Sequence, residues 1–233
     1  FSVTLVYLSG CGQSPHHRRV SNHAVANDCS MVDKRTVRDG YDALVDDYAA
    51  QRTDDSDDVE ALASFLDDLP DGSRLLDAGC GQGIPVLASL DGVSGVGLDI
   101  SHGQLARASE NAPAAALAQG DMTRLPFADD AFDAVTALWS VIHVPEGDHR
   151  TVFEEFARVL RPGGRLLLVE GTDEWRGTNP DWLGGGAAME WHIAGPEATR
   201  EQLRAVGFEI LVERTIGDSL EEDAAWTLFE ADC

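Results

Sequence analysis

The stretch from Arg74 to Gly83 constrains the fold of this chain more than any other. It reads Arg-Leu-Leu-Asp-Ala-Gly-Cys-Gly-Gln-Gly, so a short apolar run ends on Asp77 and enters a turn with glycines at positions 79, 81 and 83. Glycine permits unusual backbone angles and lets a ligand lie directly on the main chain. Pro85 follows, and proline is well tolerated in the first turn of a helix. The pattern predicts a strand, a glycine turn and a helix start, whose free N–H groups and dipole face a ligand.

The spacing of these glycines separates two classes of nucleotide-binding turn. The dinucleotide fingerprint is G-x-G-x-x-G, whereas this chain has G-x-G-x-G behind an acid. The turn resembles the acid-x-G-x-G-x-G motif of class I S-adenosylmethionine (SAM)-dependent methyltransferases and matches it at every fixed position. A structural turn that binds no cofactor is the alternative, so the rest of the chain decides.

A second segment carries the most specific resemblance. Residues 125–135 read L-P-F-A-D-D-A-F-D-A-V, which is similar to the L-P-F-x-D-x-x-F-D-x-V segment of small-molecule methyltransferases such as the quinone-biosynthetic group. Residues 158–164, R-V-L-R-P-G-G, again look like this family, and the likeness covers about residues 36–231.

The order of the expected elements indicates the fold class. Strands alternate with helices along the chain, which predicts an α/β fold with a parallel, doubly wound sheet. The resemblance implies a Rossmann-like sheet of seven strands, the last antiparallel, with helices on both faces. One methyltransferase domain is expected over residues 31–233, with N-terminal helices at 37–69, a core at 73–170, a lid or substrate loop at 171–195 and a C-terminal part at 196–231.

The predicted cofactor residues lie where strands end. Asp99 closes the strand after the glycine turn, where a carboxylate can accept from both hydroxyls of a ribose; a helix-capping aspartate is the alternative. The resemblance implies that Asp121 accepts the adenine amino group, although an ordinary turn residue is possible at this position. The full predicted set for SAM is Asp77, Gly79, Gly81, Asp99, Ile100, Asp121, Met122, Trp139 and Tyr48.

The candidate catalytic residue is His143, which follows the strand expected at residues 132–139. An imidazole titrates near working pH when unperturbed and could take a proton from a hydroxyl acceptor. A hydrogen-bonded structural histidine is the alternative, and His192 is the second choice of base. Three of the five tryptophans lie in the long, irregular connection expected at 171–195, which predicts a substrate pocket with Trp182, Trp191 and His192. Tryptophans that anchor this loop to the core are equally compatible.

Charge limits the partners of the chain. Its 41 acids against 17 bases give a net charge of −24 and a pI near 4.4. Such a field repels phosphate backbones, so we expect no nucleic-acid partner. We interpret the acidity as a solvated shell typical of a protein from a high-salt organism; a surface for a basic partner is the alternative. The motifs of DNA methyltransferases are also absent, because residues 137–140 read Ala-Leu-Trp-Ser.

The first thirty residues differ from the remainder. Residues 1–30 carry a net charge near +1, from Arg18 and Arg19 against Asp28, and Met31 opens a segment of typical acidity. We expect residues 1–30 to be disordered or not part of the native protein. The alternative is a lipoprotein signal, because Leu8-Ser9-Gly10-Cys11 looks like a lipobox.

The remaining sequence signals bear on location and on metal binding. The four cysteines lack metal-site and disulfide-framework spacing, so we expect no metal and a reducing, cytoplasmic setting. No apolar run approaches the roughly 18 residues of a membrane span. The predicted function is methyl transfer from SAM to a small-molecule acceptor through an oxygen, nitrogen or carbon nucleophile. An NAD-dependent oxidoreductase and a SAM-binding protein without catalysis are the alternatives.

Overall fold

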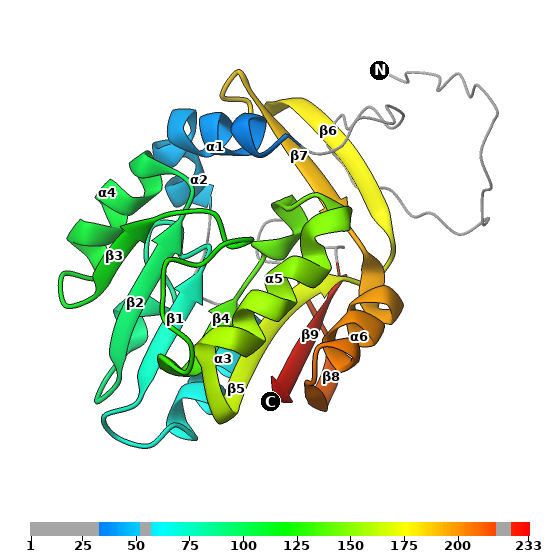
Figure 1. The fold of residues 1–233 in the computed structure, drawn as a ribbon. Helices are drawn as coiled ribbons and strands as arrows, with labels where there is room; N and C mark the ends of the chain where they lie inside the picture. The colour runs from blue at the N-terminus through cyan, green and yellow to red at the C-terminus, as the bar shows by residue number, and fades with distance from the viewer. Residues whose placement is uncertain (1–32, 52–56, 218–224) are drawn as a thin grey trace.

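The computed structural model describes residues 33–51, 57–217 and 225–233. The predictions about residues 1–30, including a lipidated Cys11, lie outside the described residues. The described chain is organised around a seven-stranded sheet in the order β3-β2-β1-β4-β5-β9-β8 (Figure 1). Its strands are β1 (Arg74–Ala78), β2 (Ser94–Asp99), β3 (Ala116–Gln119), β4 (Phe132–Ala137), β5 (Leu160–Gly171), β8 (Glu209–Gly217) and β9 (Ala225–Asp232).

The strand directions confirm the predicted fold class. Strands β3, β2, β1, β4 and β5 run parallel, and the last strand, β9, is antiparallel to both of its neighbours, β5 and β8. The chain builds β1 to β3 outward in one direction and then crosses back to place β4 beside β1. Such a reversal opens a crevice at the carboxyl ends of the strands, where α/β sheets bind their ligands.

Helices cover both faces of the sheet, as predicted. Phe153 and Phe156 of α5 (Glu146–Val159) pack in one buried cluster with Leu166 and Leu168 of β5. That cluster also takes in α6 (Gly195–Ala205), through Leu203. On the other face, α3 (Asp57–Asp67) packs with alternate residues of the same strand, Leu167 and Val169. Because successive strand side chains point to opposite faces, the apolar run of β5 serves both cores.

The helices at the start of the described chain differ from those that the apolar spacing predicts. The spacing of Tyr41 and Tyr48 predicts one helix through both, but the structure has two, α1 (Lys34–Ala43) and α2 (Val45–Gln51), separated at the buried Leu44. Helix α1 starts at Asp33, whose side chain accepts from the Arg35 backbone N–H. It lies across the edge of the sheet where the parallel strands end (Figure 1). Helix α4 (His102–Asn111) follows β2.

The connection at residues 171–195 is not irregular, and that expectation was wrong. It forms an antiparallel hairpin of β6 (Trp175–Trp182) and β7 (Ala187–Ile193). Glycines at positions 184 and 186 have φ of 71° and 75°, a backbone region that favours glycine, so the Gly-rich turn lets the chain reverse. The hairpin rises beside α1 above the sheet (Figure 1).

The helix expected after the glycine turn is also absent. Beyond Gly83 the chain forms turns and one short 3-10 helix, η1 (Leu87–Ser89), before β2 begins. Leu87 is buried and packs with Cys80 and Leu105, so this apolar stretch fills a core without an α-helix. The predicted helix dipole therefore does not face the crevice.

Candidate functional site

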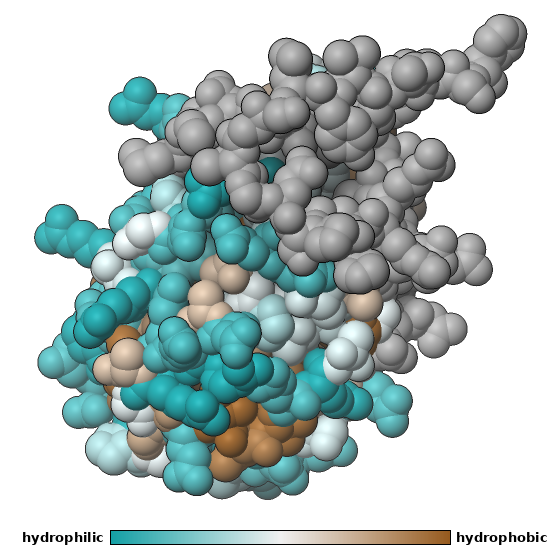
Figure 2. Space-filling view, turned by 90° about the vertical axis from the view of Figure 1, so that its right-hand side faces the viewer, coloured by the Kyte–Doolittle hydropathy of each residue, from teal (hydrophilic) through white to brown (hydrophobic). Residues whose placement is uncertain are grey.

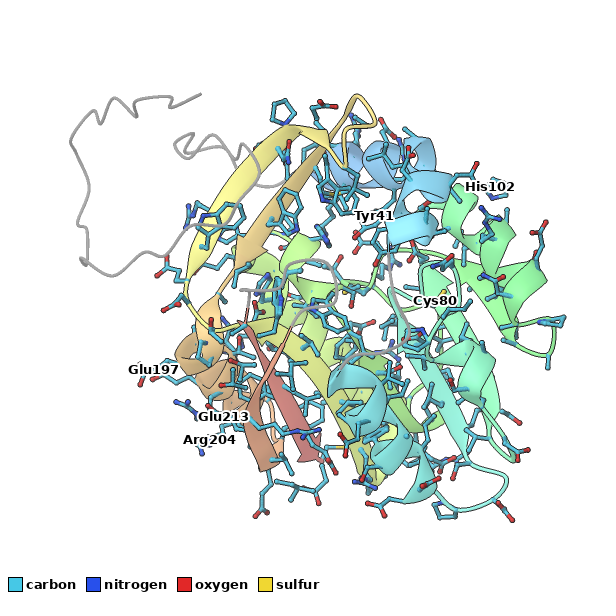
Figure 3. The ribbon with its side chains drawn as sticks, turned by 180° about the vertical axis from the view of Figure 1, so that it is seen from behind. Tyr41, Cys80, His102, Glu197, Arg204 and Glu213 are labelled. Atoms are coloured by element: carbon cyan, nitrogen blue, oxygen red, sulfur yellow. The ribbon has the colours of Figure 1, made fainter. Side chains whose placement is uncertain are left out.

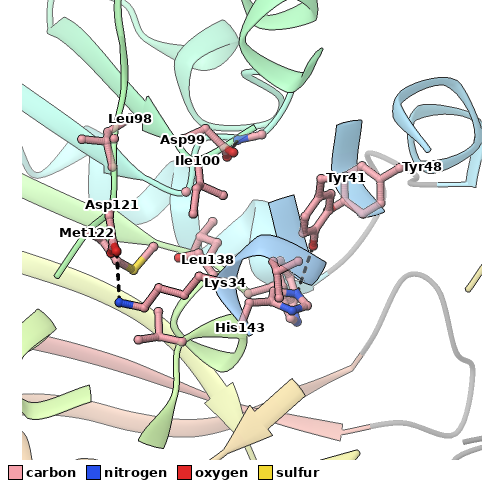
Figure 4. Close-up of a pocket in the computed structure, with 17 residues that line it drawn as sticks. Lys34, Tyr41, Tyr48, Leu98, Asp99, Ile100, Asp121, Met122, Leu138 and His143 are labelled. Carbon is pink, nitrogen blue, oxygen red and sulfur yellow. Dashed lines mark hydrogen bonds and ion pairs between the residues drawn. The ribbon is translucent and has the colours of Figure 1, made fainter. Parts of the chain in front are cut away.

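A pocket lies at the carboxyl ends of the parallel strands (Figure 4). Its volume is about 680 Å³ when the part that is open to solvent is included. Its floor comes from the turns after β1, β2 and β3 and from the segment after β4, and α1 and α2 form its roof. Most of the predicted cofactor set and the predicted base line it together: Tyr48, Gly79, Gly81, Asp99, Ile100, Asp121, Met122, Trp139 and His143. Four predicted residues do not line it, namely Asp77, Trp182, Trp191 and His192.

The glycine turn presents close backbone to the pocket but few free donors. The N–H groups of Gly79 and Cys80 both donate to the Leu98 carbonyl, at 2.7 and 3.0 Å, and the Gly81 N–H donates to Asp99 at 2.8 Å. The expectation that these N–H groups are free for a ligand was therefore wrong. Gly79 has a φ of 83°, and a Cβ there would come within 2.3 Å of the Ser140 Cβ, so the turn needs glycine to pass the segment after β4.

Asp77 lies beneath this turn rather than in the pocket. Its side chain is 3% exposed, and its carboxylate accepts from the Thr136 hydroxyl of β4 at 2.8 Å. This bond joins the ends of β1 and β4 under the glycines. Contact between Asp77 and a bound molecule remains a prediction.

Asp99 reaches the pocket with both carboxylate oxygens oriented by backbone. One oxygen accepts from Gly81 N–H and the other from Ser101 N–H, each at 2.8 Å. Burial raises the pKa of Asp99 to about 6, against the opposing effect of these bonds. Helix α4 is capped by Ser101, whose hydroxyl accepts from the Gln104 N–H, so the helix-capping alternative for Asp99 is excluded.

Asp121 follows β3 and is held from two sides. One carboxylate oxygen accepts from the backbone N–H and the hydroxyl of Thr123, at 2.9 and 2.8 Å, and the other pairs with the Lys34 ammonium at 3.0 Å. Burial acts to raise the pKa of Asp121, but the bonds from Thr123 and Lys34 outweigh it and hold the pKa below its ordinary value. Sequence reasoning missed Lys34, although it is the only lysine in the chain.

His143 is oriented for one role by two contacts. It lies in η2 (Val141–His143), and its Nδ1 is 2.8 Å from the Glu190 carbonyl of β7. A carbonyl can only accept, so Nδ1 carries the proton and neutral Nε2 has a lone pair, 3.0 Å from the Tyr41 hydroxyl. Burial lowers the pKa of His143 to about 4, so the ring is neutral at neutral pH. Tyr41 also lines the pocket and was missed as a site residue.

The tryptophans of the hairpin stand behind the pocket wall. The Trp182 ring packs against Tyr41 and Tyr48, with centroids 5.4 and 5.7 Å apart, and Trp191 lies 5.7 Å from His143. These rings therefore support the residues that line the pocket, which agrees with the alternative that they anchor the segment. Their contact with a substrate remains a prediction.

His192 has both ring nitrogens engaged at the start of α5. Its Nδ1 accepts from the Glu146 backbone N–H at 3.2 Å, and its Nε2 donates to the Glu146 carboxylate at 2.8 Å. Burial lowers its pKa. These contacts give His192 a structural role away from the pocket, which does not favour it as the second choice of base.

Two further features concern metals and membranes. Within the described ranges, no three His, Cys, Asp or Glu side chains gather as a metal site would require. Of the two cysteines described, Cys80 is buried inside the fold (Figure 3), and burial raises the pKa of its thiol. No helix among the described residues has the length and apolar character to cross a bilayer.

Comparison with known proteins agrees with this geometry. Residues 76–168 match a family model described as a methyltransferase domain. The 27-O-demethylrifamycin SV methyltransferase of Amycolatopsis mediterranei is 37% identical over 157 residues, which cover 64% of this chain and 51% of that protein. The demethylmenaquinone methyltransferase of Beutenbergia cavernae is 40% identical over 141 residues, covering 55% of this chain and 58% of that one.

A solved structure shares the fold over nearly the whole chain. Magnesium protoporphyrin IX methyltransferase from Synechocystis PCC 6803, with bound SAM, superposes with a TM-score of 0.64 over 88% of this chain and 99% of that one, at 19% identity. The chain spans 39–51% of the length of the first curated relatives that it matches. Residues 76–168 therefore match a methyltransferase domain, and the relatives of the chain include methyltransferases named for small-molecule substrates.

Proposed function

We propose that the protein transfers a methyl group from SAM to a small-molecule acceptor. The observation that carries this proposal is the convergence of three consecutive strand ends on one pocket: the glycine turn after β1, Asp99 at the end of β2 and Asp121 after β3. The relatives' methyltransferase activities support the same reading.

The residues present fit the parts of SAM. Asp99 has unused lone pairs for the two ribose hydroxyls, and Asp121 offers a carboxylate oxygen to an amino group. Apolar side chains of Leu98, Ile100 and Met122 line the same pocket as these two acids (Figure 4) and suit the faces of an adenine ring. The tyrosines of the roof present aromatic rings toward a cation such as a sulfonium.

The chain's own contribution to the reaction is positioning and proton removal. Bound SAM supplies an activated methyl group on its sulfonium. Holding an acceptor atom in line with that methyl contributes up to roughly 7–11 kcal/mol of barrier lowering. For a hydroxyl acceptor, the Nε2 lone pair of His143 would take the proton once the acceptor replaces the Tyr41 hydroxyl at that nitrogen, while the Nδ1–H bond to the Glu190 carbonyl keeps the ring oriented. An acceptor that loses no proton needs no such base.

Two other functions remain to be tested against this one. An NAD-dependent oxidoreductase is disfavoured by the G-x-G-x-G spacing and by the domain match. The same pocket is also compatible with a protein that binds SAM without transferring its methyl group, because a fold by itself does not determine function. The acidic charge supports a partner other than nucleic acid, and the lack of disulfide-framework spacing among the four cysteines supports a cytoplasmic setting.

The test has two stages. Calorimetry in high salt should give saturable binding of SAM and of S-adenosylhomocysteine (SAH), and no binding of NAD. Purified protein is then incubated with methyl-labelled SAM and a metabolite extract, and labelled products are identified by mass spectrometry. Binding without any labelled product would favour the non-catalytic alternative, and absence of SAM binding would refute the proposal.

A further inference from the structure

Lys34 connects the roof of the pocket to its floor. It is the first residue of α1 and lines the pocket, and its side chain is 25% exposed. The ammonium has three acceptors: the Asp121 carboxylate at 3.0 Å, the Thr123 hydroxyl at 3.1 Å and the Asp148 carboxylate of α5 at 3.1 Å. An ammonium has three N–H donors, so these contacts use all of them. Lys34 therefore acts on a ligand through the groups that it holds.

The arrangement of Asp121 leaves one acceptor position. Its Oδ1 accepts two bonds from Thr123, and its Oδ2 accepts one from Lys34 (Figure 4). A carboxylate oxygen has two lone pairs, and no further donor to Oδ2 exists among the described residues. The carboxylate cannot rotate without breaking its bonds to Thr123 and Lys34.

The charged groups around Lys34 favour the ionised forms of both Lys34 and Asp121. Burial acts to lower the pKa of Lys34, but the two neighbouring carboxylates outweigh it and raise the pKa. Lys34 and Asp121 thus stay charged around neutral pH.

Helix α1 is attached on the other side of the pocket as well. Asp42 accepts from the Ser101 hydroxyl at 2.6 Å and from the Gly103 N–H at 2.8 Å, next to Asp99. The helix therefore spans the pocket from the ribose end to the Asp121 end. Lys34 supplies the attachment at the Asp121 end, where the proposed function places the adenine ring.

We propose that Lys34 is a positioning residue for recognition of the cofactor's nucleobase: it fixes the Asp121 carboxylate so that the free lone pair of Oδ2 accepts the base amino group, and this contact in turn holds α1 over the ligand. The inference rests on the proposed function, because it takes an adenine nucleoside as the ligand. It differs from a simple surface ion pair, whose loss would affect all ligands alike or none.

The experiment compares two ligands that differ by one group. Binding of SAH, and of its analogue with hydrogen in place of the adenine amino group, is measured by calorimetry for the wild type and for Lys34→Met. We expect Lys34→Met to weaken SAH about tenfold, as for loss of a charge-assisted contact, and the analogue less than twofold. The matched control is Arg38→Met, which removes one positive charge from the exposed side of α1, where Asp39 is the ion-pair partner of Arg38 among the described residues.

Each outcome decides the matter. Equal weakening of both ligands would mean that Lys34 only closes α1, and unchanged SAH affinity would mean that it has no role; both overturn the inference. Failure of the wild type to bind SAH would instead refute the proposed function. If Lys34→Met does not fold, Lys34→Gln is used. In an Asp121→Asn background the effect of Lys34→Met on SAH should vanish, whereas that of Arg38→Met should be unchanged.

Discussion

At the scale of single residues, His143 combines orientation with an unusual pKa. Its contacts to Glu190 and Tyr41 set the tautomer, and burial moves the pKa to about 4. A base that is already neutral across the physiological range does not lose activity near the ordinary histidine pKa of about 6.5. The pH dependence of the reaction therefore depends on the burial of the His143 ring, which the sequence does not reveal.

The first prediction concerns the rate of methyl transfer. His143→Ala should lower turnover of a hydroxyl acceptor by roughly 100-fold or more, because a positioned base contributes about that much. In the wild type at saturating SAM, kcat should stay flat as pH falls from 8 to 5 and decline only near pH 4, where the ring gains its proton. By contrast, kcat/KM for SAM should already fall near pH 6, where Asp99 gains a proton. SAH affinity, measured by calorimetry on the same variant, is the control. Full activity of His143→Ala would make His143 a structural residue.

A second prediction concerns Asp99. Asp99→Ala should weaken SAM binding at least tenfold, since two hydroxyls would lose a charged acceptor, each such bond contributing roughly 1.5–3 kcal/mol. Calorimetry measures the affinity, and circular dichroism checks that the variant is folded, because the Gly81 and Ser101 N–H groups also lose their partner. Unchanged affinity would remove the ribose assignment.

At the scale of elements, the pocket depends on how closely the glycine turn passes the end of β4. Gly79 combines a left-handed φ of 83° with a Cβ position only 2.3 Å from the Ser140 side chain. Helix α1 and the β6–β7 hairpin close the same edge of the sheet (Figure 1), and Glu190 and Tyr41, one from each, meet at His143. The site is thus assembled from segments that lie far apart in the sequence.

The third prediction follows from the glycine turn. Gly79→Ala should destabilise the protein by about 1–3 kcal/mol, because alanine is strained at this φ and the segment that carries Ser140 must shift. Gly147→Ala in the first turn of α5 is the matched control: a Cβ there meets nothing within 4 Å, so we expect no loss of stability. Urea denaturation compares the two variants with the wild type. Equal stability of the two variants would contradict the close approach.

At the scale of the whole molecule, a buried acid at the base of the hairpin couples folding to pH. Glu170 is the last residue but one of β5 and is 0% exposed, and one of its carboxylate oxygens accepts from the Gly171 N–H at 3.0 Å. The other oxygen has no hydrogen-bond partner among the described residues. Burial raises the pKa of Glu170 to about 8. The folded state therefore holds a proton that an unfolded glutamate, with a pKa of about 4.3, gives up.

The fourth prediction gives the sign of this coupling. Between pH 4.3 and 8 the folded state binds more protons at Glu170, so its contribution to stability is full below that window and is lost as pH rises through 8. Glu170→Gln should remove this loss. The free energy of unfolding of Glu170→Gln, minus that of the wild type, should therefore be larger above pH 8 than at pH 5. Denaturant titrations at the two pH values measure it, and parallel profiles would contradict the assignment.

The fifth prediction concerns the acidic surface. Hydrophilic side chains predominate over the described part of the face in Figure 2, and the chain carries a net charge of −24. Charges of one sign repel each other, and added salt screens this repulsion, with a Debye length of about 3 Å at 1 M. The unfolding midpoint should therefore rise between 0.1 and 1 M KCl. A midpoint that is independent of salt would refute the interpretation of the acidity as an adaptation to high salt.

The sequence by itself determined the class of fold and most of the floor of the site. The buried strand runs, the acid before the glycines and the polar residues at strand ends depend on local spacing, so the parallel sheet and the positions of Asp99 and Asp121 follow from the motifs. The antiparallel last strand followed only from the resemblance to the methyltransferase family. The missing helix after the glycine turn and the hairpin at 171–195 depended on how those segments pack, which spacing does not encode.

Only the tertiary structure decided which groups meet. Lys34 and Asp121 are 87 residues apart, Tyr41 and His143 are 102 apart, and neither pair belongs to a local motif. The burial that lowers the pKa of His143 comes from elements packed around it, and the same packing placed Trp182, Trp191 and His192 outside the pocket lining. Contacts across long separations arise from the shared burial of distant segments, and such packing is a property of the folded chain.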